Sequence, residues 1–157
     1  MQRHSHKNGF TLIELLVVLV LVIVVGRFAL IVSFDRYRRA SYHVDRAYLI
    51  AALERARSLA LNDVCEGGSC AGGVSHGVSI RPDSYVIFQG ASYATRDPSF
   101  DEVVEANSTI VRSGLSEIVF APESGDVSQS GAIVLVDSSG RTSTTTIGSY
   151  GQISWTH

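Results

Sequence analysis

The chain has 157 residues, of which 45% are hydrophobic and 18% charged, with a formal net charge of −2. About 110–120 residues remain once the long apolar run near the N-terminus is set aside, enough for one modest core. From Ala40 onward there are thirteen acidic residues, seven arginines and no lysine. A protein that neutralises nucleic-acid phosphates needs a basic patch, so this balance disfavours DNA binding.

The N-terminal stretch predicts a permanent membrane anchor. A short basic head, residues 1–9, precedes an apolar segment from Phe10 to Phe34 whose only charges are Glu14 and Arg27. About 20 apolar residues suffice to span a bilayer. A removable secretory signal would have a shorter apolar core and a small-residue cleavage site after it, and no such site follows here.

Glu14 is the anomaly in this segment, because a charge at membrane depth costs about 2.5–3.5 kcal/mol on insertion scales. One interpretation places Glu14 near the helix end, within reach of lipid headgroups. The other supposes that the chain is cut after Gly9, so that Phe10 becomes a new N-terminus. The free amine of one subunit would then pair with the Glu14 carboxylate of another.

The run Gly9-Phe10-Thr11-Leu12-Ile13-Glu14, between a basic head and an apolar helix, resembles the prepilin N-terminal motif of type IV pilins and type II secretion pseudopilins. The resemblance implies that a prepilin peptidase cuts after Gly9 and N-methylates Phe10, and that Glu14 draws the subunit into a helical filament. It also implies a single-pass protein of the bacterial inner membrane with its C-terminal domain in the periplasm or outside the cell. The implied partners are other pilins or pseudopilins, the peptidase and the inner-membrane assembly platform.

Residues 35–62 are predicted to continue the same helix in amphipathic form, because no Gly or Pro interrupts the chain from Arg27 to Asn62. Apolar residues recur at the three-and-four spacing of one helix face, which we expect to pack on a sheet. These residues are Leu49, Ala52, Leu53, Ala56, Leu59 and Ala60.

The two cysteines, Cys65 and Cys70, enclose the flexible tetrapeptide Glu-Gly-Gly-Ser. In an oxidising compartment we expect them to form a disulfide. Two unpaired thiols are the alternative, since a metal site would need more ligands than Glu66 and the distant His76 supply.

Residues 63–157 form the predicted β-rich globular domain. Val78–Ile80 and Tyr85–Phe88 read as a hairpin around Arg81-Pro82-Asp83-Ser84, followed by an acidic loop at 90–102. The remaining strands are expected at 103–112, which includes Asn107, and at 116–121, 131–137, 142–148 and 152–155. Residues 132–136, apolar on both faces, predict a central and fully buried strand. The result is an α+β fold, with the long helix laid against a mainly antiparallel sheet domain.

A second resemblance covers the rest of the chain. The stretch from Ala56 to Leu61, Phe120-Ala121-Pro122 with a following Gly125, and the terminal Gly151-Gln152-Ile153 are similar to landmarks of the GspH/FimT minor pseudopilins. This family has a long helix and a β domain of two small sheets. The chain differs from it at Leu59 and Gln152, where the family often has an acidic and a basic residue.

The sequence contains no recognisable catalytic motif. We find no nucleophile elbow, phosphate-binding loop or dinucleotide fingerprint. None of the histidines has a further ligand at metal spacing, and His76 reads as a loop residue rather than a general base. We therefore expect no cofactor and no bound metal. The sequence predicts a structural subunit, a minor pilin or pseudopilin, with a DNA-binding minor pilin or a major fibre-forming pilin as the alternatives.

Overall fold

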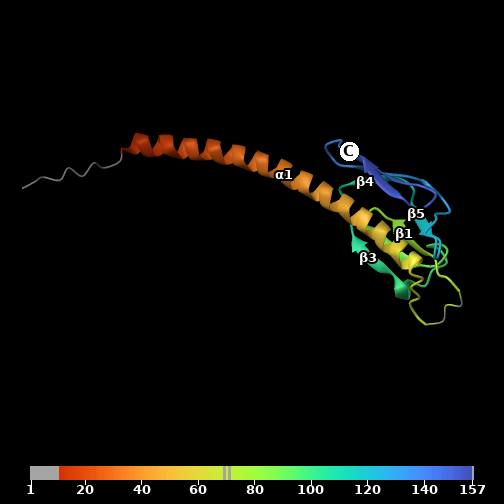
Figure 1. Cartoon of the computed structure of the whole chain (residues 1–157). Coiled ribbons are helices and arrows are strands. Elements are labelled where there is room, and N and C mark those ends of the chain that lie inside the picture. Colours follow the sequence, from red (N-terminus) through yellow and green to blue (C-terminus); the bar gives the residue numbers. More distant parts are fainter. Residues whose placement is uncertain (1–10, 69, 71, 157) are drawn as a thin grey trace, which may run out of the picture. The chain divides into compact units, whose positions relative to one another are not determined.

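The computed structural model describes residues 11–68, 70 and 72–156. In chain order they form the helix α1 (Leu12–Leu61), strands β1 and β2, a short 3-10 helix η1 (Pro98–Phe100) and strands β3 to β8, coloured in this order from red to blue in Figure 1. The chain divides into two compact units, residues 1–40 and residues 41–157, and α1 contributes to both.

Helix α1 confirms the predicted continuous helix, and its end has a local cause. Asp63 has a φ of +48°, the left-handed conformation that commonly ends helices. The Asp63 and Val64 amides donate to the carbonyls of Ala60 and Leu59, at 3.2 Å and 3.0 Å, and so satisfy acceptors of the last turn. The predicted first residue, Phe10, lies outside the described residues.

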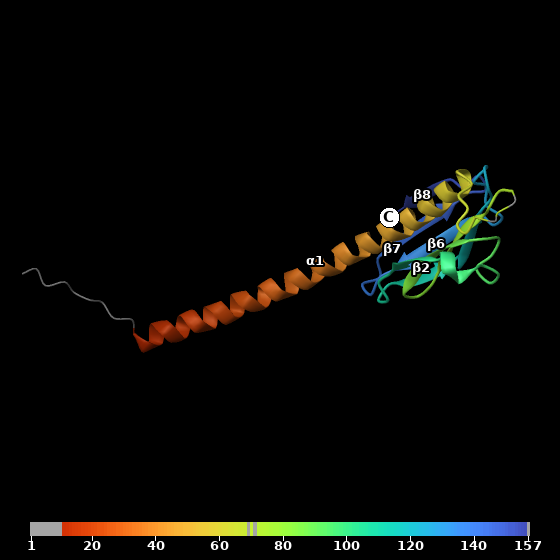
Figure 2. The same cartoon turned by 90° about the horizontal axis from the view of Figure 1, so that it is seen from below.

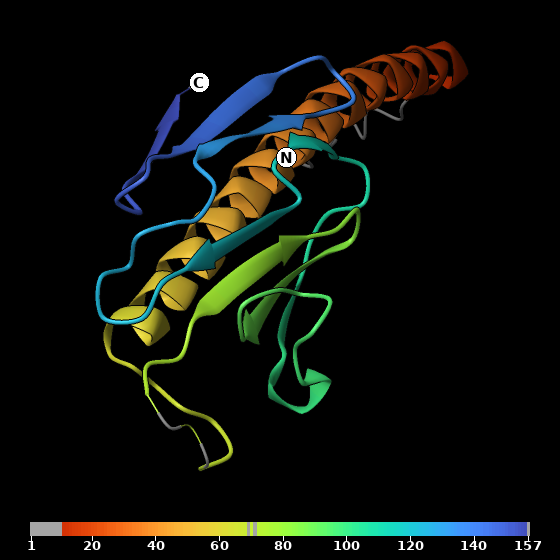
Figure 3. The same cartoon turned by 90° about the vertical axis from the view of Figure 1, so that its right-hand side faces the viewer.

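The second unit, residues 41–157, is called the domain below, and it contains two four-stranded antiparallel sheets. The first sheet has the order β3-β2-β1-β5 and consists of β1 (His76–Ile80), β2 (Ser84–Gln89), β3 (Glu102–Glu105) and β5 (Glu117–Phe120). The second has the order β4-β6-β7-β8 and consists of β4 (Val111–Gly114), β6 (Gly131–Val136), β7 (Thr142–Ile147) and β8 (Ile153–Thr156). Figure 3 shows both sheets beside the C-terminal turns of α1, and Figure 2 gives the view from below. The α+β fold with two small sheets is therefore confirmed.

One hydrophobic core joins the helix to both sheets. The predicted stripe on α1 is buried, with Leu49, Leu53, Ala56 and Ala60 all at 0% exposure. It packs on inward-facing residues of the strands, namely Val78, Tyr85, Ile87, Ile118, Phe120, Ile133, Leu135 and Ile147. The predicted hairpin is also present, because β1 pairs with β2 and the Arg81 amide donates to the Ser84 carbonyl at 2.9 Å.

The single strand expected at 103–112 is wrong. This segment forms the end of β3 in one sheet and the start of β4 in the other, separated by a turn at Asn107. The Asn107 side-chain oxygen accepts hydrogen bonds from the Thr109 amide at 2.9 Å and the Thr109 hydroxyl at 2.8 Å. Such a local side-chain turn competes with strand pairing, so Asn107 is a turn residue.

Strand β6 has a central position, as expected, but it is not fully buried. Ile133 and Leu135 face the core at 0% exposure, whereas Ala132, Val134 and Val136 are partly exposed. Only one face of this antiparallel sheet is covered, so apolar β-branched residues on the other face remain accessible to solvent.

A buried ion pair ties α1 to both sheets, and sequence reasoning missed it. The Asp45 carboxylate accepts from the Tyr85 hydroxyl of β2 at 2.9 Å and from Arg112 Nη2 of β4 at 2.6 Å. It also accepts from the Asn107 amide at 2.8 Å. The Arg112 and Asp45 side chains are only 4% and 1% exposed. Breaking such a pair is costly because it strands a buried charge.

Candidate functional site

The N-terminal turn of α1 carries Glu14, the anomalous carboxylate of the apolar segment. The Thr11 amide donates to Glu14 Oε2 at 3.5 Å, and the Glu14 amide donates to Thr11 Oγ1 at 3.3 Å. This reciprocal pair is a capping box, which satisfies two of the amides that an N-terminal turn leaves open. Both side chains are exposed, so the Glu14 carboxylate stays accessible to a further partner.

Gly9 and Phe10, the residues of the predicted cleavage and methylation site, lie outside the described residues. The capping box nevertheless begins at Thr11, directly after them. The cleavage, the methylation and the pairing of Glu14 with a subunit amine stay predictions.

The first turns of α1 present an apolar surface on every side. All side chains from Thr11 to Phe28 are exposed, and Leu15 to Val25 form an unbroken apolar run whose exposures reach 66% at Val25. A helix that is hydrophobic all round is normally covered, either by a larger assembly or by lipid. Within residues 11–68, 70 and 72–156, no helix meets the combined length and hydropathy needed to cross a membrane. The predicted anchor, residues 10–34, also includes Phe10 and the side chains of 29–34, which are outside the described set.

The disulfide loop begins directly after α1. Cys65 and Cys70 are joined, with their Cα atoms 6.1 Å apart, so the predicted disulfide is present. Gln89 of β2 fixes the loop, because its Oε1 accepts from the Glu66 amide at 2.8 Å and its Nε2 donates to the Glu66 carbonyl at 3.2 Å. The disulfide and the two hydrogen bonds to Gln89 together restrain the loop.

The structure brings together the three landmarks of the second resemblance at the end of α1. The Glu123 amide, just after Phe120-Ala121-Pro122, donates to the Ala60 carbonyl at 3.0 Å. Gly151 has a φ of +67°, and a Cβ there would lie 2.1 Å from the Gly125 carbonyl oxygen and 3.1 Å from Arg57 Nε. Segments far apart in sequence therefore meet where only glycine allows the approach.

His76 was predicted to be a loop residue, and this is wrong. It is the first residue of β1 and only 2% exposed. Burial lowers the pKa of His76, although the Val74 carbonyl and the nearby Glu66 and Asp63 carboxylates oppose that shift. His76 pairs with Gln89 of β2 and Phe120 of β5, and these strand partners are not evident from the sequence around it.

Comparison with models of protein families gives a match in the N-terminal segment. The model of the prokaryotic N-terminal methylation motif matches residues 4–26. The chain is therefore type IV pilin-like at its N-terminus. Comparisons with curated proteins and with solved structures found no match.

The matched segment includes Gly9, Phe10 and Glu14, and it indicates a processed subunit of the pilin or pseudopilin kind. The capping box and the start of the exposed apolar surface lie inside the same 23-residue stretch. This part of the chain is the candidate functional site.

Proposed function

We propose that this protein is a structural subunit, a minor pilin or pseudopilin, of a type IV pilus or type II secretion pseudopilus. The methylation motif at residues 4–26, continuous with an exposed helix that is apolar on every side, carries the proposal. A prepilin peptidase cuts after Gly9 and methylates Phe10. Residues 10–34 hold the subunit in the inner membrane before the assembly platform moves it into a filament.

In the filament, the apolar helix is buried among neighbouring subunits, and Glu14 pairs with the amine of an adjacent Phe10. A buried ion pair is weak as a source of net stability, but it penalises every register in which the carboxylate has no partner. The accessible Glu14 carboxylate supports this role, because the capping box does not use its whole hydrogen-bonding capacity.

The GspH/FimT type of minor pseudopilin is our preferred assignment within this class. It is supported by the contact of the three landmark segments around Arg57, Gly125 and Gly151. A DNA-binding minor pilin is the weaker candidate, because acidic residues outnumber basic ones in the sequence of the domain.

Mass spectrometry of the N-terminal peptide from native cells tests the proposal. Sheared surface filaments are compared with the membrane fraction. A peptide that begins at methylated Phe10 in filaments identifies a pilus component, and the same peptide confined to membranes identifies a pseudopilus or priming subunit. An intact Met1 in both fractions would contradict processing after Gly9.

A further inference from the structure

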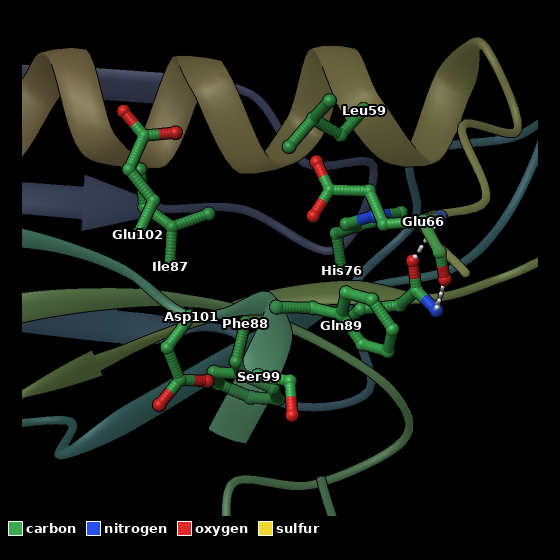
Figure 4. A pocket seen from close by; sticks show the side chains of 10 residues that line it. Leu59, Glu66, His76, Ile87, Phe88, Gln89, Ser99, Asp101 and Glu102 are labelled. Atoms are coloured by element: carbon green, nitrogen blue, oxygen red, sulfur yellow. Dashed lines mark hydrogen bonds between the residues drawn. The ribbon is translucent and has the colours of Figure 1, made fainter. Parts of the chain in front are cut away.

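A small pocket lies beside the disulfide loop. It is lined by the end of α1, the loop, the start of β1, the end of β2, η1 with the residue that follows it, and the first residue of β3 (Figure 4). Its volume is about 120 Å³. The sequence resemblances gave no role to any of its polar residues. Its lining residues lie far along the chain from the methylation motif, so it is a candidate binding site separate from that motif.

His76 lines this pocket, and its ring has an unused hydrogen-bond acceptor. Its Nδ1 lies 3.2 Å from the Val74 carbonyl oxygen. A carbonyl can only accept, so Nδ1 carries the proton, and Nε2 of the neutral ring is an acceptor. Among the described residues Nε2 has no hydrogen-bond partner, although the residue is 98% buried. A buried polar atom without a partner is uncommon and calls for a missing donor.

The lining also has an uncompensated negative charge. Asp101 is matched by Arg96, whose Nη2 lies 2.8 Å from its carboxylate, and Glu102 lies 3.6 Å from Arg55 Nε. Within the described part of the chain, the Glu66 carboxylate has no such cation. Its backbone is fixed by the two hydrogen bonds from and to Gln89 that Figure 4 shows as dashed lines.

The conformation of the disulfide loop at Gly67 is fixed by a close contact with η1. Gly67 has a φ of +100°, and a Cβ there would lie 2.6 Å from the Phe100 ring. The loop therefore packs directly on η1, and the wall that carries Glu66 is formed before any ligand arrives.

These features select the chemistry of a ligand. The pocket offers a carboxylate and a neutral acceptor, and its walls include apolar side chains, Leu59, Ile87, Phe88 and Phe100. No group of three or more potential metal ligands occurs among the described residues. A volume of about 120 Å³ is well below the ~300–1,000 Å³ of sites for drug-sized ligands, so it suits only a small group such as a short alkylammonium. We propose that the pocket binds a primary ammonium group on a short alkyl chain, the side chain of a lysine presented by a partner protein.

The lysine comes from a different protein. The only lysine of this chain is Lys7, within the predicted leader 1–9. A second processed copy would have no lysine to offer, so the pocket marks a contact between unlike subunits and not a contact between copies.

Histidine-selective NMR of the full chain in detergent micelles tests the pocket. The ¹⁵N shift of His76 Nε2 is followed during titration with butylammonium chloride, with sodium chloride and n-butanol as controls for ionic strength and for apolar binding. We expect a saturable shift with butylammonium alone. Glu66→Gln should weaken the affinity about tenfold, because it removes a charge-assisted contact. Glu105→Gln, which makes the same charge change on an exposed residue of β3 outside the pocket, should leave it unchanged.

A second arm distinguishes the source of the ammonium group. A blocked Gly-Lys-Gly peptide should reproduce the shift, and the same peptide with acetylated lysine should not. Binding of butylammonium without binding of the peptide would overturn the lysine assignment and leave a site for a free amine. A shift equal to that of sodium chloride or n-butanol, or an equal affinity of the Glu66→Gln chain, would overturn the ammonium site itself.

Discussion

Single backbone positions decide how closely the strands of the domain approach one another. Gly114, at the end of β4, has a φ of +99°, and a Cβ there would lie 2.1 Å from the Ala132 carbonyl oxygen. Gly140, in the β6–β7 turn, has a φ of +80° with no atom within 4 Å of its Cβ position. The two glycines share a left-handed backbone but differ in the space around them.

This difference predicts unequal effects of one substitution. Gly140→Ala should lower the free energy of unfolding by about 1–2 kcal/mol, the cost of a left-handed alanine. Gly114→Ala should cost at least about 2 kcal/mol more, because β4 must also move away from β6. Chemical denaturation of the full chain in detergent measures both. Equal effects would show that the contact of Gly114 with Ala132 relaxes without cost.

The buried ring of His76 predicts a pH dependence of stability. Its folded pKa lies below the ordinary value of 6.5, because burial disfavours the charged form. The groups whose charges act on it are Glu66, Asp63 and Arg55. Between the two pKa values the unfolded chain binds more protons, so this contribution is full above pH 6.5 and is lost as the pH falls toward the folded pKa.

His76→Phe removes this titration and should flatten the plot of unfolding free energy against pH below 6.5, whatever its effect on stability at neutral pH. The unaltered chain, measured over the same pH range, provides the control. Urea denaturation at a series of pH values gives the slopes. An unchanged slope in the His76→Phe chain would contradict the burial of a neutral ring in the folded state.

At the scale of elements, the domain part of α1 is held to the two sheets by one polar junction as well as by the apolar core. Asp45 accepts from Tyr85 in one sheet and from Arg112 in the other. Burial raises the pKa of Tyr85, so its hydroxyl keeps its proton and remains a donor to Asp45. The junction fixes where along the helix each sheet lies.

Asp45→Ala should destabilise the domain by about 3–5 kcal/mol, because it leaves the Arg112 charge buried and unmatched. Arg112→Met alone should cost a comparable amount. The double variant should cost less than the sum of the two, with a coupling energy of about 1–3 kcal/mol in a double-mutant cycle. Additive effects in thermal unfolding of the three variants would mean that solvent reaches the junction.

The sequence allowed the helix, the hairpin, the disulfide and the fold class to be predicted, because each depends on local spacing or on a short loop. It did not allow the division of 103–112 between two sheets, since the Asn107 turn outweighs the strand propensity around it. Nor did it reveal the burial of Arg112, whose partner Asp45 is 67 residues away, or of His76, whose strand partners are Gln89 and Phe120. The pocket beside the disulfide loop was not predictable, because its walls come from segments between Leu59 and Glu102 that only the fold brings together.

At the scale of the whole molecule, the two units have different chemistry. Residues 41–157 contain the core, the disulfide and the buried ion pair, whereas the described side chains of residues 11–28 are all exposed. Among the described residues, the core of the domain does not include Glu14. A change at Glu14 should therefore affect assembly without affecting the stability of the domain.

Glu14 has two possible roles, a cap for its own helix and a charge for another subunit, and two substitutions separate them. Glutamine can replace glutamate in a capping box, so Glu14→Gln keeps the cap and removes the charge, whereas Glu14→Ala removes both. If the charge pairs with a subunit amine, both variants should enter filaments at least about tenfold less than the unaltered chain, since each leaves that amine unmatched. Quantitative immunoblots of sheared or affinity-captured filaments measure entry, and thermal unfolding of the domain, expected to be unchanged, is the control. Normal assembly of Glu14→Gln together with a defect in Glu14→Ala would assign Glu14 to helix capping and would remove the ion pair from the proposed mechanism.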